Sequence, residues 1–212
     1  MRVLKLKCKS FRNLGEVEII PCEETNVICG ENAQGKTNLL EAIWLFTGAK
    51  SFRTNKDADF LQFSKQKATL ELNFLSEGIE NEAEISITDK RRVVFNQNKL
   101  SSASGMAGKF NAVIFSPIDL SLVSDGPAVR RRFLDTAIGQ IYPTYITILK
   151  NYLRAVSQRN KVIKEFKYDS TLSIMLDVFE AEIADYGKKI TEYRQRYIEA
   201  LNMFLPKVYD GI

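Results

Sequence analysis

An eight-residue segment near the N-terminus has the residue types and spacing of a phosphate-binding loop. Residues 30–37 read Gly-Glu-Asn-Ala-Gln-Gly-Lys-Thr and fit the P-loop pattern G-x-x-x-x-G-K-[ST] at every fixed position. An apolar run, 27–29, precedes the segment and a helix-like run, 38–46, follows it. This is the strand, loop and helix setting that the motif requires, so the pattern favours nucleotide binding over a chance glycine turn followed by a lysine.

Each residue type in the loop has a chemical reason. Glycines at 30 and 35 allow backbone angles that turn consecutive N–H groups toward an anion at a helix N-terminus. Lys36 would carry a positive charge to the β- and γ-phosphates, and the Thr37 hydroxyl would take one position around Mg²⁺. The predicted nucleotide site therefore contains Gly30, Glu31, Asn32, Ala33, Gln34, Gly35, Lys36, Thr37 and Asn38.

Composition excludes several classes of protein. The chain has 212 residues, 45% hydrophobic and 26% charged, which is ordinary for a globular protein with a sizeable core. It has no histidine, which excludes Ser-His-Asp or Cys-His nucleophiles, and its three cysteines lack the C-x-x-C spacing of a zinc site. The net charge of +4 is too small to imply nucleic-acid binding by itself. With no membrane-length apolar run and no signal peptide, we expect a cytoplasmic protein without a membrane partner.

The elements that must position the loop are predicted from hydrophobic period. Alternating runs predict strands, and a short continuous apolar run predicts a buried central strand. The predicted strands are a first ribbon at 2–8 and 16–20, the strand feeding the loop at 25–29, a meander at about 67–76, 80–88 and 92–96, and a central strand at 111–115. We therefore expect an α/β lobe with a mixed sheet over residues 1–117.

From about residue 118 the apolar residues recur at helical spacing, which predicts an α-helical lobe over 118–212. A break with a cap is expected at 168–171, then a helix from about 171 to 204 that Pro206 closes. Residues 173–177 resemble a Walker B strand that ends in a carboxylate. Their apolar positions follow a helical stripe, however, so we predict that Asp177 lies on a solvated helix face.

Several separated motifs, taken with the P-loop, resemble the RecF family of bacterial DNA replication and repair proteins, whose ATPase head is related to those of SMC and ABC ATPases. The motifs are Phe11-Arg12-Asn13, residues 30–38, Ser51-Phe52-Arg53-Thr54, residues 115–120, residues 130–135 and Gln158-Arg159-Asn160. The combination is specific although each short motif is weak. It implies a P-loop NTPase fold of the ABC/SMC-head type, here the N-terminal portion, followed by a helical lobe.

The same resemblance implies an ATP-dependent clamp on DNA. In that family two heads bind ATP and Mg²⁺, form a homodimer, and act with the RecO and RecR proteins at single-strand gaps to load recombinase after DNA damage and in the SOS response. By resemblance, Arg12 and Asn13 could reach the nucleotide. Ser116 or Asp119 could replace the magnesium-binding glutamine that relatives carry after the central strand.

Four basic residues are candidates for DNA contact. Arg53 and Lys56 lie in a polar stretch after the P-loop helix, where a solvated loop is an equally good explanation. Arg130 and Arg131 belong to a run of three arginines, 130–132. Successive helical residues point about 100° apart, so all three cannot face one ligand, and we expect at least one to pair internally with a residue such as Asp135.

Two motifs of such heads are not recognisable in the chain: the LSxGQ-like signature and a Walker B strand. In RecF both lie toward the C-terminus, so the chain resembles a piece of a longer protein or a short relative. We expect weak ATPase activity of a complete protein, no assigned catalytic residue here, and ATP binding that exceeds hydrolysis. Two alternatives stay open: a small-molecule P-loop kinase, which the ribbon before the P-loop disfavours, and a non-catalytic assembly module.

Overall fold

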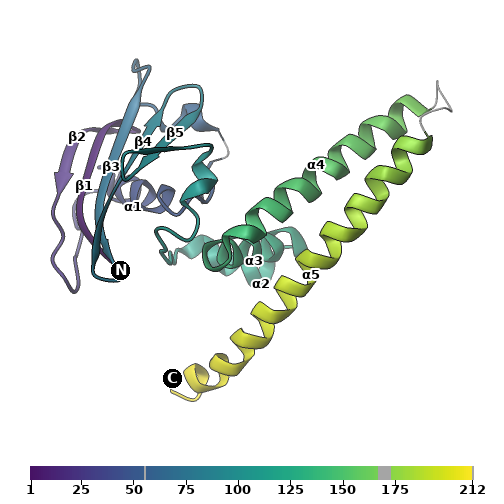
Figure 1. Ribbon diagram of the computed structural model, residues 1–212. Helices are drawn as coiled ribbons and strands as arrows, with labels where there is room; N and C mark the ends of the chain where they lie inside the picture. Colours follow the sequence, from purple (N-terminus) through teal and green to yellow (C-terminus); the bar gives the residue numbers. More distant parts are fainter. Residues whose placement is uncertain (55, 167–172, 212) are drawn as a thin grey trace. The chain divides into compact units, whose positions relative to one another are not determined.

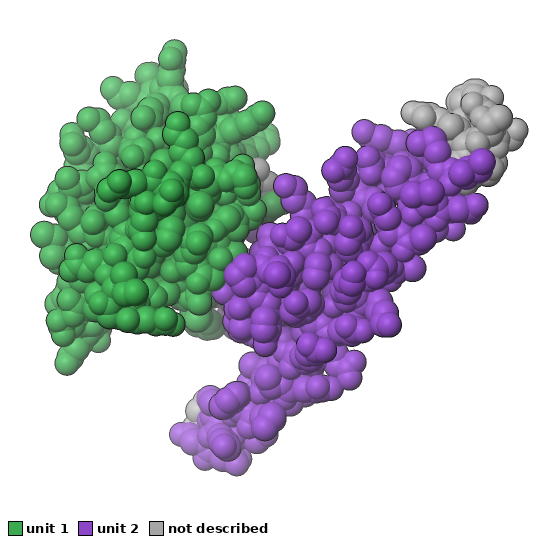
Figure 2. Space-filling model, in the orientation of Figure 1, with its two compact units in different colours: residues 1–117 green, residues 118–212 purple. Residues whose placement is uncertain are grey.

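The computed structural model describes residues 1–54, 56–166 and 173–211. The chain separates into two compact units, residues 1–117 and 118–212 (Figure 2). The first unit carries the strands and the P-loop, and the second is built of helices (Figure 1). Among the described residues, no helix is both long enough and apolar enough to span a lipid bilayer.

The first unit is organised around a six-stranded sheet with the order β2-β1-β3-β4-β5-β6. Its strands are β1 (Arg2–Phe11), β2 (Leu14–Ile19), β3 (Ala68–Ser76), β4 (Ile79–Ile87), β5 (Arg91–Phe95) and β6 (Asn98–Leu100). Side chains alternate between the two faces of a strand, and the alternate residues Leu70, Leu72 and Phe74 of β3 are fully buried. The predicted ribbon and meander are confirmed, with β3 to β5 within one residue of the predicted bounds.

One helix covers the buried face of this sheet. α1 (Lys36–Leu45) directs Leu39, Ala42 and Leu45 into the same core as the β3 side chains. Three short 3₁₀ helices, η1 (Asp57–Phe60), η2 (Ala103–Met106) and η3 (Pro117–Leu120), lie in the connections. Phe60 of η1 stacks on Phe11 at the end of β1, with ring centroids 5.6 Å apart. The P-loop helix and the first strand are therefore joined through a shared core.

The sheet differs from the predicted one in its pairing. Every pair of strands among the described residues is antiparallel, so the prediction of a mixed sheet was wrong. Residues 25–29 and 111–115, both predicted as strands, have no strand assignment. Several of their apolar side chains face solvent instead: Val27 is 83% exposed and Val113 98%. A strand exists only where a neighbouring strand accepts and donates its backbone hydrogen bonds, and within the described part of the chain neither run belongs to a pair of strands.

The second unit consists of α2 (Ser121–Ser124), α3 (Pro127–Ile141), α4 (Pro143–Phe166) and α5 (Ser173–Tyr209). α4 and α5 lie side by side as a long helical hairpin (Figure 1). Ile138 of α3, Tyr145 of α4 and Ile190 of α5 form the small core of this unit. The buried Tyr145 hydroxyl donates to Asp135, and Arg194 Nη2 donates to the same carboxylate at 2.7 Å. The arginine that pairs with Asp135 here thus comes from α5.

Two predictions for the helices have different outcomes. Residues 173–177 are helical and Asp177 is exposed, as predicted. Pro206 does not close the last helix, because α5 continues through it to Tyr209, and the Pro206 carbonyl accepts from the Asp210 N–H at 2.9 Å. The predicted break at 168–171 lies outside the described residues.

Candidate nucleotide-binding site

The P-loop connects directly to α1 and has the backbone of an anion-binding turn. Gly30, Ala33 and Gly35 have positive φ angles of 145°, 64° and 99°. Gly35 is the N-cap of α1, so the loop ends where the positive end of the helix dipole begins. Residues 30–34 are exposed. A loop of this shape at a helix N-terminus is suited to surround a phosphate with backbone N–H groups.

Lys36 folds back over the loop. Its Nζ donates to the carbonyl oxygens of Gly30 at 2.7 Å and Glu31 at 2.6 Å. These two bonds hold a positive charge at the mouth of the loop, where phosphate oxygens could accept in place of the carbonyls. Thr37 follows in the first turn of α1 and is exposed, so its hydroxyl is accessible to a magnesium ion that accompanies a nucleotide. The residues present therefore fit both groups.

The turn between β1 and β2 packs against this loop. Asn13 Nδ2 donates to the carbonyl oxygen of Ala33 at 2.7 Å. A Cβ atom added at Gly35 would lie 2.6 Å from Leu14 Cδ2 and 2.8 Å from Asn13 Oδ1. A Cβ atom here would force these two side-chain ends to move, and the positive φ of Gly35 independently favours glycine. Asn13 thus contacts the P-loop backbone, and its contact with a nucleotide stays a prediction.

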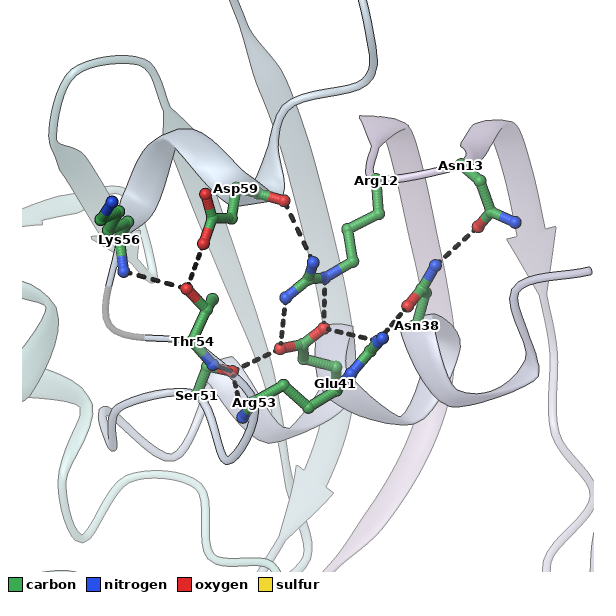
Figure 3. Close-up of polar contacts among 9 residues, drawn as sticks. All are labelled: Arg12, Asn13, Asn38, Glu41, Ser51, Arg53, Thr54, Lys56 and Asp59. Atoms are coloured by element: carbon green, nitrogen blue, oxygen red, sulfur yellow. Dashed lines mark hydrogen bonds and ion pairs between the residues drawn. The ribbon is translucent and has the colours of Figure 1, made fainter. Parts of the chain in front are cut away.

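Arg12 is bound by a buried carboxylate. Its Nε and Nη2 donate to the two carboxylate oxygens of Glu41, the latter at 3.0 Å (Figure 3). Its Nη1 donates to the Asp59 carbonyl oxygen at 3.2 Å, and the guanidinium carbon lies 5.3 Å from the centre of the Phe60 ring. In this structure Arg12 joins β1 to α1 and η1, and its contact with a nucleotide stays a prediction.

Arg53 lies on the other side of the same carboxylate. Its Nη1 is 3.6 Å from Glu41 Oε2 and also donates to Asn38 Oδ1 (Figure 3). Asn38 Nδ2 in turn donates to Asn13 Oδ1 at 2.6 Å. The structure therefore brings together four of the predicted site residues, from three separate motifs, beside the first turns of α1. Lys56 is exposed three residues before Asp59, and its N–H donates to Thr54 Oγ1 at 3.1 Å.

The remaining predicted residues belong to other parts of the chain. Ser116 is half-buried at the end of the first unit, and Asp119 lies in η3 in the second. Arg130 and Arg131 are exposed in the first turns of α3. Arg130 Nη1 donates to the carbonyl oxygens of Leu122 at 3.1 Å and Asp125 at 2.8 Å. The proposed roles of these residues in binding magnesium or DNA stay predictions.

Two residues of the cluster were not among the predicted site residues. Glu41 is fully buried in α1, and Ser51 Oγ, also buried, donates to its Oε1. The sequence signal that could have indicated Glu41 is its position as a single carboxylate on the core-facing side of the P-loop helix, next to Ala42. A charge at such a position requires buried partners, but the sequence does not say which ones.

Comparison with known proteins places the chain in a family. The family model described as an AAA domain matches residues 5–203. The chain belongs to the AAA domain family. Within it, the chain is 34% identical to the DNA replication and repair protein RecF of Clostridium perfringens and 36% identical to that of Listeria monocytogenes, each across the whole chain. The chain spans 58% of the length of these relatives.

Solved structures agree with this placement. The AAA domain chain superposes on the recombination mediator protein RecF with ATP, from the RecFOR pathway, with a TM-score of 0.89 and 33% identity. The match covers 93% of this chain and 54% of the other. A second structure of the same kind, RecF-ATPrS, gives a TM-score of 0.88. The predicted resemblance to the N-terminal portion of RecF, and the P-loop NTPase fold class, are confirmed.

Proposed function

We propose that this chain is the ATP-binding part of a DNA replication and repair protein of the RecF kind. The observation that supports it most directly is the glycine-bounded loop at the N-terminus of α1 with Lys36 folded over it. ATP would lie with its phosphates against the backbone of residues 30–36. Lys36 would neutralise phosphate charge, and Thr37 would help to hold Mg²⁺, which supplies further charge neutralisation when bound.

The proposal extends to the action of a complete protein. ATP binding would favour a homodimer that holds DNA, and this dimer would act with RecO and RecR at single-strand gaps in the cytoplasm after DNA damage, as part of the SOS response. The support is the similarity to RecF, one structure of which is described as a recombination mediator in the RecFOR pathway. Basic residues on both units, Arg53, Lys56, Arg130 and Arg131, are the proposed DNA contacts.

Nucleotide binding is tested by Lys36→Ala. Loss of a charge-assisted contact of about 1.5–3 kcal/mol should weaken the affinity for Mg-ATP by about tenfold or more, measured by titration calorimetry. Lys99→Ala, at an exposed lysine of β6, is the matched control and should leave the affinity unchanged. Equal affinities of the Lys36→Ala variant and the unmodified chain would remove the central claim.

DNA binding is tested separately, by fluorescence anisotropy with labelled single-stranded and gapped DNA at several salt concentrations. The proposal predicts tighter binding with Mg-ATP than without it, and weaker binding by the double variant Arg130→Ala, Arg131→Ala. A DNA affinity that falls with salt but is the same with and without Mg-ATP would instead indicate simple electrostatic attraction between basic residues and DNA phosphates. That result would contradict the clamp. In that case the Lys36→Ala result still stands on its own.

A further inference from the structure

Glu41 is the most deeply buried charge of the first unit and it has an unusual set of donors. It is 0% exposed, in the second turn of α1. Arg12 and Ser51 donate to its two oxygens, and Arg53 adds a second guanidinium at 3.6 Å. A buried carboxylate is stable only when its oxygens accept hydrogen bonds or ion pairs from such partners. One carboxylate thus fixes two guanidinium groups beside the P-loop (Figure 3).

A series of polar contacts leads from this carboxylate to the P-loop backbone. It begins with the 3.6 Å ion pair between Glu41 and Arg53 and continues as hydrogen bonds. Arg53 donates to Asn38 Oδ1, and Asn38 Nδ2 donates to Asn13 Oδ1 at 2.6 Å. Asn13 Nδ2 then donates to the Ala33 carbonyl oxygen at 2.7 Å. We call these five residues, Glu41, Arg53, Asn38, Asn13 and Ala33, the amide relay.

The two ends of the amide relay determine its direction. A guanidinium can only donate, so Asn38 must present its oxygen to Arg53 and its NH₂ to Asn13. A backbone carbonyl can only accept, so Asn13 must present its NH₂ to Ala33. No alternative orientation of either amide satisfies both ends. Hydrogen bonds aligned in this way strengthen one another, and the loss of one end releases both amides.

The amide relay ends at the residue of the P-loop that most needs support. Ala33 has a φ of 64°, in the left-handed region that a residue with a Cβ atom rarely adopts, and it lies in the exposed part of the loop. The next contact of the same turn is at Gly35, where an added Cβ atom would lie under 3.0 Å from the side chains of Asn13 and Leu14. A loop held in its binding shape before the ligand arrives avoids the entropic cost of ordering at the moment of binding.

We propose that Glu41 is a positioning residue of the nucleotide site, which holds the P-loop in its phosphate-binding shape through Arg53, Asn38 and Asn13. This inference depends on the proposed function, because the ligand of the loop is taken to be a nucleotide. It assigns to Glu41 an effect on the loop that a purely structural ion pair would not have.

The test compares Glu41→Gln, which keeps the shape and removes the charge, with Asp135→Asn. Asp135 is the matched control, because it also binds an arginine and a buried hydroxyl but lies in the second unit. Amide hydrogen exchange of the nucleotide-free protein is read in the peptide that covers residues 30–39. Glu41→Gln should speed exchange there by about tenfold or more, and Asp135→Asn should not. The affinity for Mg-ATP should fall by about tenfold in Glu41→Gln alone.

A second variant keeps the inference testable if Glu41→Gln does not fold. Asn13 is exposed at the β1–β2 turn, so Asn13→Ala should preserve the fold and still speed exchange of the loop. Where both variants fold, the double variant should exchange no faster than either single one, because both interrupt the same relay, whereas independent effects would multiply. Additive effects, an unchanged loop in Asn13→Ala, or equal effects of Glu41→Gln and Asp135→Asn would each overturn the inference.

Failure of the inference about Glu41 can be distinguished from failure of the proposed nucleotide binding. Faster exchange of the loop together with normal binding of Mg-ATP by the unmodified chain supports both proposals. Faster exchange in a chain that binds no nucleotide overturns the proposed function, and with it the nucleotide role assigned to Glu41.

Discussion

At the scale of single residues, the three cysteines differ in burial and so should differ in reactivity. Burial raises the pKa of the Cys8 thiol to about 12, whereas Cys22 and Cys29 are exposed. Since the thiolate is the reactive form, only about 10⁻⁴ of Cys8 would be ionised at pH 8, far less than for an ordinary thiol. We predict that iodoacetamide at pH 8 labels Cys22 and Cys29 in the folded chain and reaches Cys8 only after unfolding in urea. Mass spectrometry measures the sites, and equal labelling of Cys8 and Cys22 in the folded chain would contradict the burial.

The same reagent reports on the nucleotide site. Cys29 directly precedes Gly30, whereas Cys22 is seven positions further from the loop and serves as an internal control. Bound Mg-ATP should slow labelling of Cys29 and leave Cys22 unchanged.

The P-loop and its lysine could be predicted from the sequence because the motif consists of adjacent residues. The partners of Arg12, Asn13 and Arg53 could not be predicted, because they come from segments far apart along the chain that only the fold brings together.

At the scale of elements, the end of α1 depends on one glycine. Gly48 has a φ of 76°, and an added Cβ atom would lie 3.0 Å from both the Ala103 carbonyl oxygen and the Ala107 nitrogen. These are backbone atoms that cannot move aside easily. We predict that Gly48→Ala lowers the free energy of unfolding of the first unit by about 1–2 kcal/mol. Trp44, the only tryptophan, lies in α1, so its fluorescence in urea reports on this unit. Gly15→Ala is the control, because nothing lies within 4 Å of its added Cβ, and a similar loss there would contradict the steric explanation.

The strands show which elements the sequence could predict. β3, β4 and β5 agree with the alternating runs because each strand pairs with a neighbour close in sequence, and the turns between them fix the register. The runs 25–29 and 111–115 were predicted from apolar character alone, which says that a segment can be buried but not what pairs with it. Hydrophobic period could therefore predict the strands β3 to β5, whereas the pairing of the two apolar runs could not be predicted.

At the scale of the whole molecule, these runs should govern how the chain behaves in solution. Val27, Val113 and Phe115 are largely exposed in the first unit, and Phe204 and Val208 are exposed near the end of α5. Exposed apolar groups in contiguous segments promote association. We predict that the chain associates as its concentration rises, and that the double variant Val113→Ser, Phe115→Ser lowers the association measured by sedimentation velocity. Phe63→Ser is the matched control, because Phe63 is 95% exposed outside both runs.

Nucleotide dependence separates this association from the proposed dimer. Contacts between apolar runs should be as strong without ATP as with it, and should strengthen in sodium sulfate, which favours burial of apolar surface. A dimer that depends on ATP should instead appear only with Mg-ATP and disappear in Lys36→Ala. The double serine variant separates the two kinds of association in one experiment. It should lose the association through the apolar runs and keep any dimer that depends on ATP. If Val113→Ser, Phe115→Ser leaves the sedimentation profile without ATP unchanged, the exposed runs do not drive association.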